Sequence, residues 1–316
     1  MSRPIVISNT PLNALYTSRL NEFFEFHDRP HLNDAALFQR LAPEVRALAA
    51  GGESKVPAEF MDQLPKLELI SVMGVGYDGV DVAAAKARGI TVTHTPDVLN
   101  DEVADTALAL MLATARQIPA ADRHVRAGLW PQGAFPLARK MSGARLGLLG
   151  MGRIGQAIAK RALAFDMSVA YHTRTPRLEL PYAYHPSAVS LAAASDFLVA
   201  ITPGGAATRK LVNAEVLAAL GQKGIFINVA RGSVADEAAL VDALQRGVIA
   251  GAGLDVFENE PQVPRALIDM PQVVLTPHIG SATVQTRNAM ADLAVDNLKA
   301  LFGGQPYKTP VPECRT

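Results

Sequence analysis

Three polar side chains in the last third of the chain have types that together suit one kind of chemistry. Arg231, Glu260 and His278 each follow a short apolar run that reads as a strand, and ligands bind at the carboxyl ends of the strands in an open parallel sheet. A guanidinium binds a carboxylate, and an imidazolium donates a proton, in a charged form that a neighbouring carboxylate favours by about 1–3 pKa units. The set suits reduction of a 2-oxo acid, with Arg231 binding the carboxylate and polarising the carbonyl, His278 as proton donor and Glu260 as its partner.

Each of these residues has a simpler explanation when it is taken alone. An arginine after a strand is usually a surface charge, Glu260 could be an ordinary loop carboxylate, and His278 after a proline could cap a helix. Glu258 competes with Glu260 for the place beside the imidazole. The catalytic interpretation gains weight because the three residues follow a nucleotide-binding pattern in order.

That pattern is Gly150-Met151-Gly152-Arg153-Ile154-Gly155, placed between an apolar strand at 146–149 and a helix at 153–165. Gly150 permits a tight turn, Gly152 lets the backbone approach a pyrophosphate, and Gly155 lets helix and strand pack closely. The N–H groups of the helix N-terminus then face the phosphates. A bare glycine pattern is weak, so the strand–turn–helix context carries the prediction; the alternative is a plain turn between strand and helix.

The end of the next strand predicts which dinucleotide is bound. NAD-binding units place Asp or Glu there, about 20 residues after the glycines, to hold the ribose diol. The strand at 168–171 ends instead in His172-Thr173-Arg174-Thr175, with Asp166 at its wrong end and Glu179 too far along. Hydroxyls and a guanidinium suit a 2′-phosphate. Thr173, Arg174 and Thr175 therefore predict NADPH/NADP, with NADH as the weaker alternative, unless Arg174 is merely an exposed charge in a solvated turn.

The elements that must position these residues follow an α/β rhythm of short apolar runs and longer amphipathic segments. In the first third we expect strands at 5–8, 23–27, 67–73 and 90–92, and a helix at 34–49. A nearly all-apolar helix at 101–117, capped by Asn100 or Asp101, should lie buried between layers or domains. A second series follows, with strands at 146–149, 168–171, 196–201, 224–229, 251–256 and 273–276, and helices at 153–165, 214–220, 235–246 and 282–302. This rhythm predicts a doubly wound parallel sheet.

Composition excludes several other classes of protein. The 316 residues suggest two domains, and 49% hydrophobic with 19% charged residues is an ordinary globular composition. Lys+Arg and Asp+Glu both number 30, so no basic field for nucleic acid exists, and no apolar run is long enough for a membrane span. Cys314 is the only cysteine, which excludes an intrachain disulfide and fits a cytoplasmic protein. We expect no metal site, since Pro30 interrupts the His27–His31 spacing.

The chain resembles the D-isomer-specific 2-hydroxyacid dehydrogenase family at four segments. They are 147–155, AsnValAlaArgGly at 228–232, LeuAspValPheGluAsnGluPro at 254–261 and ThrProHisIleGly at 276–280. The resemblance implies two Rossmann-like/flavodoxin-like doubly wound parallel-sheet domains with the active site in the cleft between them. It implies a discontinuous substrate domain, 1–99 and 284–316, and a dinucleotide-binding domain, 100–283. It also implies a homodimer, because Gly128-Leu129-Trp130 in the irregular 128–144 loop matches the family's dimerisation region; the alternative for Trp130 is a local hydrophobic plug.

The resemblance also assigns individual residues. The family's catalytic residues fall on Arg231, Glu260 and His278, and its preference for the Glu before Pro favours Glu260 over Glu258. The segment 71–81 matches the substrate loop, where N–H groups around Val75 and Gly76 would hold the carboxylate and Tyr77 would line the pocket or belong to the core. Asp255 matches the residue that holds the nicotinamide carboxamide. Further cofactor contacts are expected at Thr202, Pro203, Val229, Ala230 and Gly280.

Within the family, 95–105 and the ThrArgThr at 173–175 resemble the NADPH-dependent glyoxylate, hydroxypyruvate and hydroxyphenylpyruvate reductases. The absent ribose carboxylate argues against a phosphoglycerate or lactate dehydrogenase. Two rivals remain: a nucleotide-sensing, corepressor-like binding protein, and a related NAD-dependent enzyme on the same scaffold. Formate dehydrogenases of this kind carry Gln where Glu260 stands. Catalytic turnover separates the first rival, and activity on formate separates the second.

Overall fold

The computed structural model describes residues 3–315, which fall into two compact units. The first unit joins the residues up to Leu99 to those from Thr283 onward, and the second is Asn100–Ala282. Residues 1, 2 and 316, at the outer ends of the predicted substrate domain, lie outside the described part. No helix among residues 3–315 is long and apolar enough to cross a membrane.

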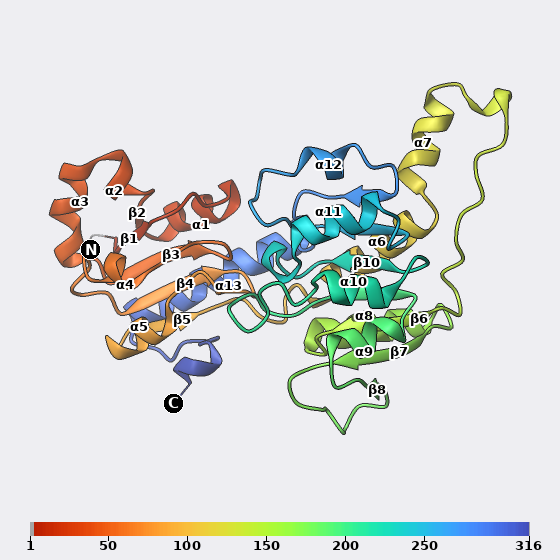
Figure 1. Ribbon diagram of the computed structural model, residues 1–316. Coiled ribbons are helices and arrows are strands. Elements are labelled where there is room, and N and C mark those ends of the chain that lie inside the picture. Colours follow the sequence, from red (N-terminus) through yellow and green to blue (C-terminus); the bar gives the residue numbers. More distant parts are fainter. Residues whose placement is uncertain (1–2, 316) are drawn as a thin grey trace. The chain divides into compact units, whose positions relative to one another are not determined.

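The first unit is a five-stranded parallel sheet in the order β2-β1-β3-β4-β5 (Figure 1). This is the flavodoxin-like strand order, in which the direction of strand addition reverses between β1 and β3. Its strands are β1 (Ile5–Ser8), β2 (Glu25–His27), β3 (Ala47–Gly51), β4 (Leu69–Met73) and β5 (Thr91–Thr93). Its helices are α1 (Ala14–Phe23), α2 (Pro30–Asn33), α3 (Ala35–Leu41), η1 (Ala42–Glu44), α4 (Ala58–Met61), α5 (Val82–Ala87), α13 (Val284–Gly303) and η4 (Pro312–Cys314).

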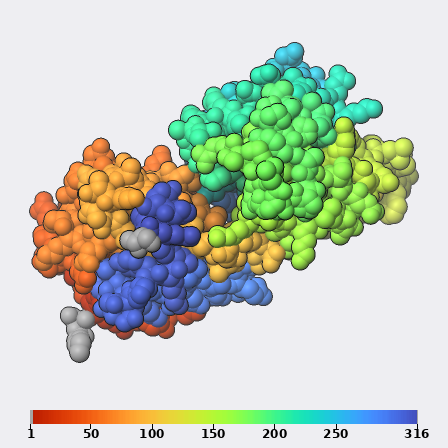
Figure 2. Space-filling model, turned by 90° about the horizontal axis from the view of Figure 1, so that it is seen from below, coloured from red at the N-terminus to blue at the C-terminus, as the bar shows by residue number. Residues whose placement is uncertain are grey.

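The end of the chain completes this first unit. Figure 2 shows the blue C-terminal residues lying beside the orange N-terminal third. The contact is specific, because the Ser71 hydroxyl on β4 donates to the carbonyl oxygen of Ala294 on α13 at 2.9 Å. Val311 lies in the core of the unit, and its N–H donates to the carbonyl oxygen of Val92 on β5 at 2.9 Å.

The second unit is a seven-stranded parallel sheet in the order β12-β11-β10-β9-β6-β7-β8. From β8 to β11 this is the Rossmann order, with the switch point between β6 and β9. Its strands are β6 (Arg145–Leu149), β7 (Ser168–His172), β8 (Ala183–Tyr184), β9 (Phe197–Ala200), β10 (Ile225–Asn228), β11 (Gly251–Leu254) and β12 (Val273–Leu275). Its helices are α6 (Asn100–Ala115), α7 (Ile118–Arg126), η2 (Trp130–Gln132), α8 (Arg153–Leu163), α9 (Ala188–Ala193), α10 (Ala214–Leu220), η3 (Gly232–Val234), α11 (Glu237–Gln245) and α12 (Arg265–Ile268).

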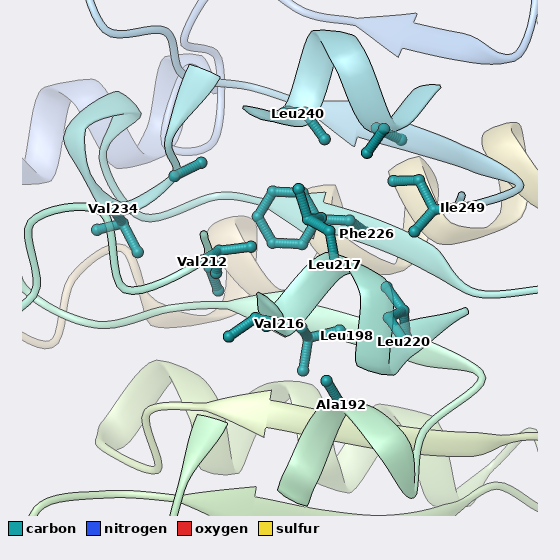
Figure 3. Close-up of a cluster of buried hydrophobic side chains, with 14 of the residues drawn as sticks. Ala192, Leu198, Val212, Val216, Leu217, Leu220, Phe226, Val234, Leu240 and Ile249 are labelled. Atoms are coloured by element: carbon teal, nitrogen blue, oxygen red, sulfur yellow. The ribbon is translucent and has the colours of Figure 1, made fainter. Parts of the chain in front are cut away.

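Together the two parallel sheets with their helices confirm the predicted fold class. The core of the second unit lies where α10 and α11 cover β9 and β10. Figure 3 shows Phe226 of β10 among Leu198 of β9, Leu217 of α10 and Leu240 of α11. All four are buried aliphatic or aromatic side chains. Their packing holds α10 and α11 against β9 and β10.

Two sequence-based element predictions are wrong. The helix expected at 34–49 ends as α3 at Leu41, and 47–51 is strand β3. Pro43 interrupts the helix, and pairing of β3 between β1 and β4 overrides the helix preference of AlaLeuAlaAla. The strand predicted at 23–27 begins at Glu25, because Phe23 ends α1, which the sequence analysis missed.

The other differences are smaller. Helix α6 already includes Asn100, so neither Asn100 nor Asp101 is its N-cap. Strand β11 ends at Leu254, which puts Asp255 in the turn that follows rather than within the strand. The segment 127–144 has no regular element besides η2, as expected for an irregular loop. With α7 it extends away from the sheet of its own unit (Figure 1).

Candidate active site

His278 and Glu260 form a close pair in the second unit. The Nδ1 atom of His278 lies 2.7 Å from Oε2 of Glu260, and the other carboxylate oxygen accepts the N–H of Phe257 at 2.9 Å. Both side chains are partly buried. The carboxylate is thus fixed by its own turn and orients the imidazole through Nδ1.

The competing residue, Glu258, lies elsewhere. Its carboxylate is 3.6 Å from the guanidinium of Arg209, and its N–H donates to Oε2 of Glu237 at 3.1 Å. Burial raises the pKa of Glu237, and the like charge of Glu258 adds to the effect. The structure therefore places Glu260, not Glu258, beside His278.

Asp255 holds the turn that carries His278. This carboxylate is 2% exposed, and it accepts the Thr276 hydroxyl at 2.7 Å and the N–H groups of Ile279 and Gly280, both at 2.8 Å. The N–H of His278 also donates to the Asp255 carbonyl oxygen at 2.9 Å. Asp255 thus serves the His278 turn directly, and the carboxamide contact expected of it stays a prediction.

Arg231 lies in the turn after β10, and that turn packs on the segment leading to Glu260. Asn228, which is buried, donates to the Arg231 carbonyl oxygen at 3.0 Å and accepts the Ala230 N–H at 3.1 Å. A Cβ atom on Gly232 would lie 1.9 Å from the carbonyl of Phe257. Only glycine allows this approach, which joins the arginine turn to the Glu260 turn.

The glycine loop has the geometry predicted for it. Gly150 has φ +105°, and a Cβ there would lie 2.5 Å from the carbonyl oxygen of Ile201, while one on Gly155 would lie 2.6 Å from that of Gly150. A Cβ on Gly152 meets nothing within 4 Å, and α8 begins at the next residue, Arg153, followed by Ile154 in its first turn. The loop is thus tightly packed on the sheet and open at Gly152, which is the arrangement a pyrophosphate needs.

The neighbouring turns offer further groups to a dinucleotide. The buried Thr202 hydroxyl has no hydrogen-bond partner among the described residues, which suits a ligand contact. Pro203 accepts the Thr208 hydroxyl at 2.7 Å, and Val229 and Ala230 are buried. The cofactor contacts expected at Pro203, Val229 and Ala230 stay predictions.

The turn after β7 has no carboxylate at the ribose position. The Thr173 hydroxyl donates to the Thr175 carbonyl oxygen at 2.7 Å, and Tyr184 donates to that of Thr173 at 3.3 Å. Arg174, between the two threonines, is exposed. The turn thus presents a guanidinium to solvent, which fits both recognition of a 2′-phosphate and the alternative of a solvated charge, so the phosphate contact stays a prediction.

The predicted substrate loop lies in the first unit and is held by two residues that the sequence analysis did not identify. His94, which is buried, has its Nδ1 3.0 Å from the Val75 carbonyl oxygen, and its ring stacks edge-on against Tyr77. The Tyr77 hydroxyl donates to Glu313 at 3.1 Å; burial, then this carboxylate, raise the Tyr77 pKa to about 12. Gly76 lies between these two fixed residues.

Comparison with known proteins decides the family. Residues 108–280 match the model of the D-isomer specific 2-hydroxyacid dehydrogenase NAD-binding domain. Hydroxyphenylpyruvate reductase of Plectranthus scutellarioides is 45% identical over 97% of this chain and 98% of its own. Glyoxylate/hydroxypyruvate reductase A of Arabidopsis thaliana is 48% identical over the same shares. This chain belongs to the D-isomer specific 2-hydroxyacid dehydrogenase family.

A solved structure from this family matches closely along the whole chain. The NADPH-dependent glyoxylate/hydroxypyruvate reductase of Sinorhizobium meliloti, solved with NADP and malonate, is 53% identical and has a TM-score of 0.93. The match covers 99% of this chain and 98% of that one. The predicted membership of the family is confirmed. These three relatives are all named as reductases, which are oxidoreductases.

The supporting residues Asn228, Glu237, His94 and Glu313 were missed for a common reason. Asn228, Glu237 and His94 hold backbone groups of a turn. Glu313 accepts the Tyr77 hydroxyl. Each of these contacts depends on the folded path of the chain. Only Asn228 had a signal in the sequence, because it opens the AsnValAlaArgGly segment of this dehydrogenase family.

Proposed function

We propose that the chain is a cytoplasmic NADPH-dependent reductase that converts 2-oxo acids to D-2-hydroxy acids. Glyoxylate and hydroxypyruvate are the substrates we favour, with hydroxyphenylpyruvate as a third. The observation that carries the proposal is the His278–Glu260 pair, 2.7 Å apart, in the same unit as the Gly150–Gly155 loop. The relatives, among them an NADPH-dependent reductase solved with NADP, support the same reaction class.

In the mechanism we propose, Arg231 binds the substrate carboxylate and polarises the carbonyl group. His278 enters as the imidazolium, with Nδ1–H donating to Glu260, and gives the proton on Nε2 to the carbonyl oxygen. NADPH, when bound, supplies the hydride. Glu260 stabilises the charged ring before transfer and holds the ring plane throughout.

Each unit has a separate task in this proposal. The second unit, 100–283 in the sequence-based division, holds the cofactor through the glycine loop, Thr202 and the Thr173–Thr175 turn. The first unit, 1–99 with 284–316, holds the substrate carboxylate through the N–H groups near Val75 and Gly76. Support comes from the contacts that fix both loops, the Arg177 bond to Met151 and the His94 bond to Val75.

We also propose that the protein is a homodimer that uses α7 and the loop after it. Of the large apolar side chains that are exposed, Ile118, Val125, Leu129, Trp130 and Leu137 lie in this one segment. Trp130 is 67% exposed and Leu137 fully exposed. A cluster of exposed apolar groups on a projecting arm is characteristic of an interaction surface.

The test of the function is turnover by the purified protein. NADPH or NADH is mixed with glyoxylate, hydroxypyruvate, pyruvate, phenylpyruvate or hydroxyphenylpyruvate, and cofactor oxidation is followed. We expect fast turnover with NADPH and a ranking that favours the small acids. Nucleotide binding without turnover on any acid would favour the corepressor-like alternative, and higher kcat/KM with NADH would favour the NAD-dependent one.

A further inference from the structure

One arginine links the two loops that we assign to the cofactor. Nη1 of Arg177, in the loop between β7 and β8, donates to the carbonyl oxygen of Met151 in the glycine loop at 2.8 Å. Its Nε donates to Glu179 at 2.7 Å. The two ends of the Arg177–Met151 bond are 26 positions apart in the sequence, and a charged donor makes this a strong type of hydrogen bond.

The backbone of Arg177 is fixed as firmly as its side chain. The Arg177 N–H donates to the Tyr171 hydroxyl at 2.8 Å, and that hydroxyl donates to the Arg177 carbonyl oxygen at 3.1 Å. Tyr171 lies on β7 and is buried. The chain from 172 to 176 is therefore held at one end by β7 and at the other by Arg177.

We propose that Arg177 is a positioning residue of the NADPH site, a role that rests on the proposed function. By holding Met151, it fixes the Thr173–Thr175 turn relative to the glycine loop, so that Arg174 meets the 2′-phosphate while the loop meets the pyrophosphate. NADH lacks the 2′-phosphate and gains little from this alignment. Arg177 thus sets the preference between the two cofactors through Arg174.

Direct reading of the phosphate by Arg177 is the alternative, and its contacts argue against it. Its Nη1 is bound to a carbonyl oxygen and its Nε to the Glu179 carboxylate. A phosphate on the Nε side would lie beside that carboxylate and be repelled. Arg174 is exposed and lies within the turn itself.

The first experiment measures KM, kcat and nucleotide binding for Arg177→Met. We expect KM and Kd for NADPH to rise about tenfold, with kcat at saturating NADPH and KM for NADH within about twofold of wild type. Arg177→Lys, which keeps a charged donor, should recover most of the loss. Arg246→Met is the matched control, because Arg246 is an exposed arginine paired with Asp242 on α11, and it should leave both cofactors unaffected. An equal loss for NADPH and NADH would overturn the proposal.

The second experiment is a double-mutant cycle with Arg174→Ala. If Arg177 acts through Arg174, adding Arg177→Met to Arg174→Ala changes the NADPH/NADH ratio of kcat/KM by less than about twofold. Additive losses from the two substitutions would show that Arg177 acts independently of Arg174, as a direct phosphate contact would, and would overturn the positioning role. The turnover assay on wild type distinguishes failure of this inference from failure of the proposed function. If wild type turns over with NADPH but the Arg177 variants keep the wild-type KM and Kd for NADPH, only the positioning role is refuted. If wild type shows no turnover, the proposed function is refuted.

Discussion

His278 is fixed by its backbone as well as by its ring. Its φ is +53°, a left-handed conformation that costs a non-glycine residue about 1–2 kcal/mol. Asp255 offsets this cost by accepting the N–H groups of the next two residues, Ile279 and Gly280. With Glu260 holding Nδ1, both the ring and the chain that carries it are oriented before a substrate binds.

The pair predicts how the rate depends on pH. Glu260→Gln removes the negative charge that stabilises the imidazolium. The variant should therefore lose its proton donor at a lower pH than wild type does. We expect the midpoint of the reductive pH–rate profile to fall by about 1–3 pH units, measured as kcat/KM between pH 5 and 9. Glu258→Gln is the matched control, because Glu258 pairs with Arg209 instead. An unchanged midpoint in Glu260→Gln would remove Glu260 from this role.

The exposed guanidinium of Arg174 predicts cofactor preference. Arg174→Ala should weaken NADPH by about 10- to 100-fold, since a hydrogen bond to a charged group contributes about 1.5–3 kcal/mol, and should leave NADH nearly unaffected. Titration of the protein with each reduced nucleotide measures this directly. If both nucleotides weaken equally, Arg174 does not read the 2′-phosphate.

At the scale of elements, local patterns predicted the second sheet better than the first. Helix α10 was predicted with its observed bounds, and the glycine loop was placed correctly between β6 and α8. Both have strong local signals, namely an Asn213 cap with an apolar face and a strand–turn–helix pattern. Strand β3, AlaLeuAlaAlaGly, has no such signal, because its identity depends on pairing with β1 and β4.

The contacts that fix the site depend on the fold in the same way. Arg231, Glu260 and His278 were candidates because each follows a strand, but the choice of Glu260 over Glu258 came from the family resemblance. Nothing in the sequence indicates that Glu237 at the start of α11 holds the N–H of Glu258, 21 positions later. This contact joins the start of a helix to the turn after a strand, so it becomes visible only with the folded chain.

Glu237 also predicts a stability effect that depends on pH. Its pKa is raised in the folded protein by burial, so the folded state binds the proton more tightly and loses stability as pH rises through the window above about 4.5, the ordinary glutamate value. Gln keeps an oxygen for the Glu258 N–H without the charge. Glu237→Gln should therefore raise the Tm by roughly 1–3 °C at pH 7, with no gain at pH 4.

A matched control is available for this thermal measurement. Glu215 also lies in the first turn of its helix, α10, but is exposed, so Glu215→Gln should show no gain at pH 7 relative to pH 4. An equal gain in Tm for Glu237→Gln at both pH values would contradict the burial argument. A buried glutamate with a raised pKa is protonated in acid, so the Tm difference between variant and wild type should vanish there.

At the scale of the whole molecule, the apolar arm predicts the oligomeric state. An exposed tryptophan is a typical interface hot spot, and its loss commonly costs about 2 kcal/mol or more of binding. We expect sedimentation to give twice the 33.5 kDa of one chain for wild type and a shift toward one chain for Trp130→Glu. Leu32→Glu changes an equally exposed apolar residue on α2 and should remain dimeric. A wild-type protein that sediments as a single chain at micromolar concentration would refute the dimer. If Trp130→Glu and Leu32→Glu both dissociate, the effect is not specific to the arm, and the arm is not assigned as the interface.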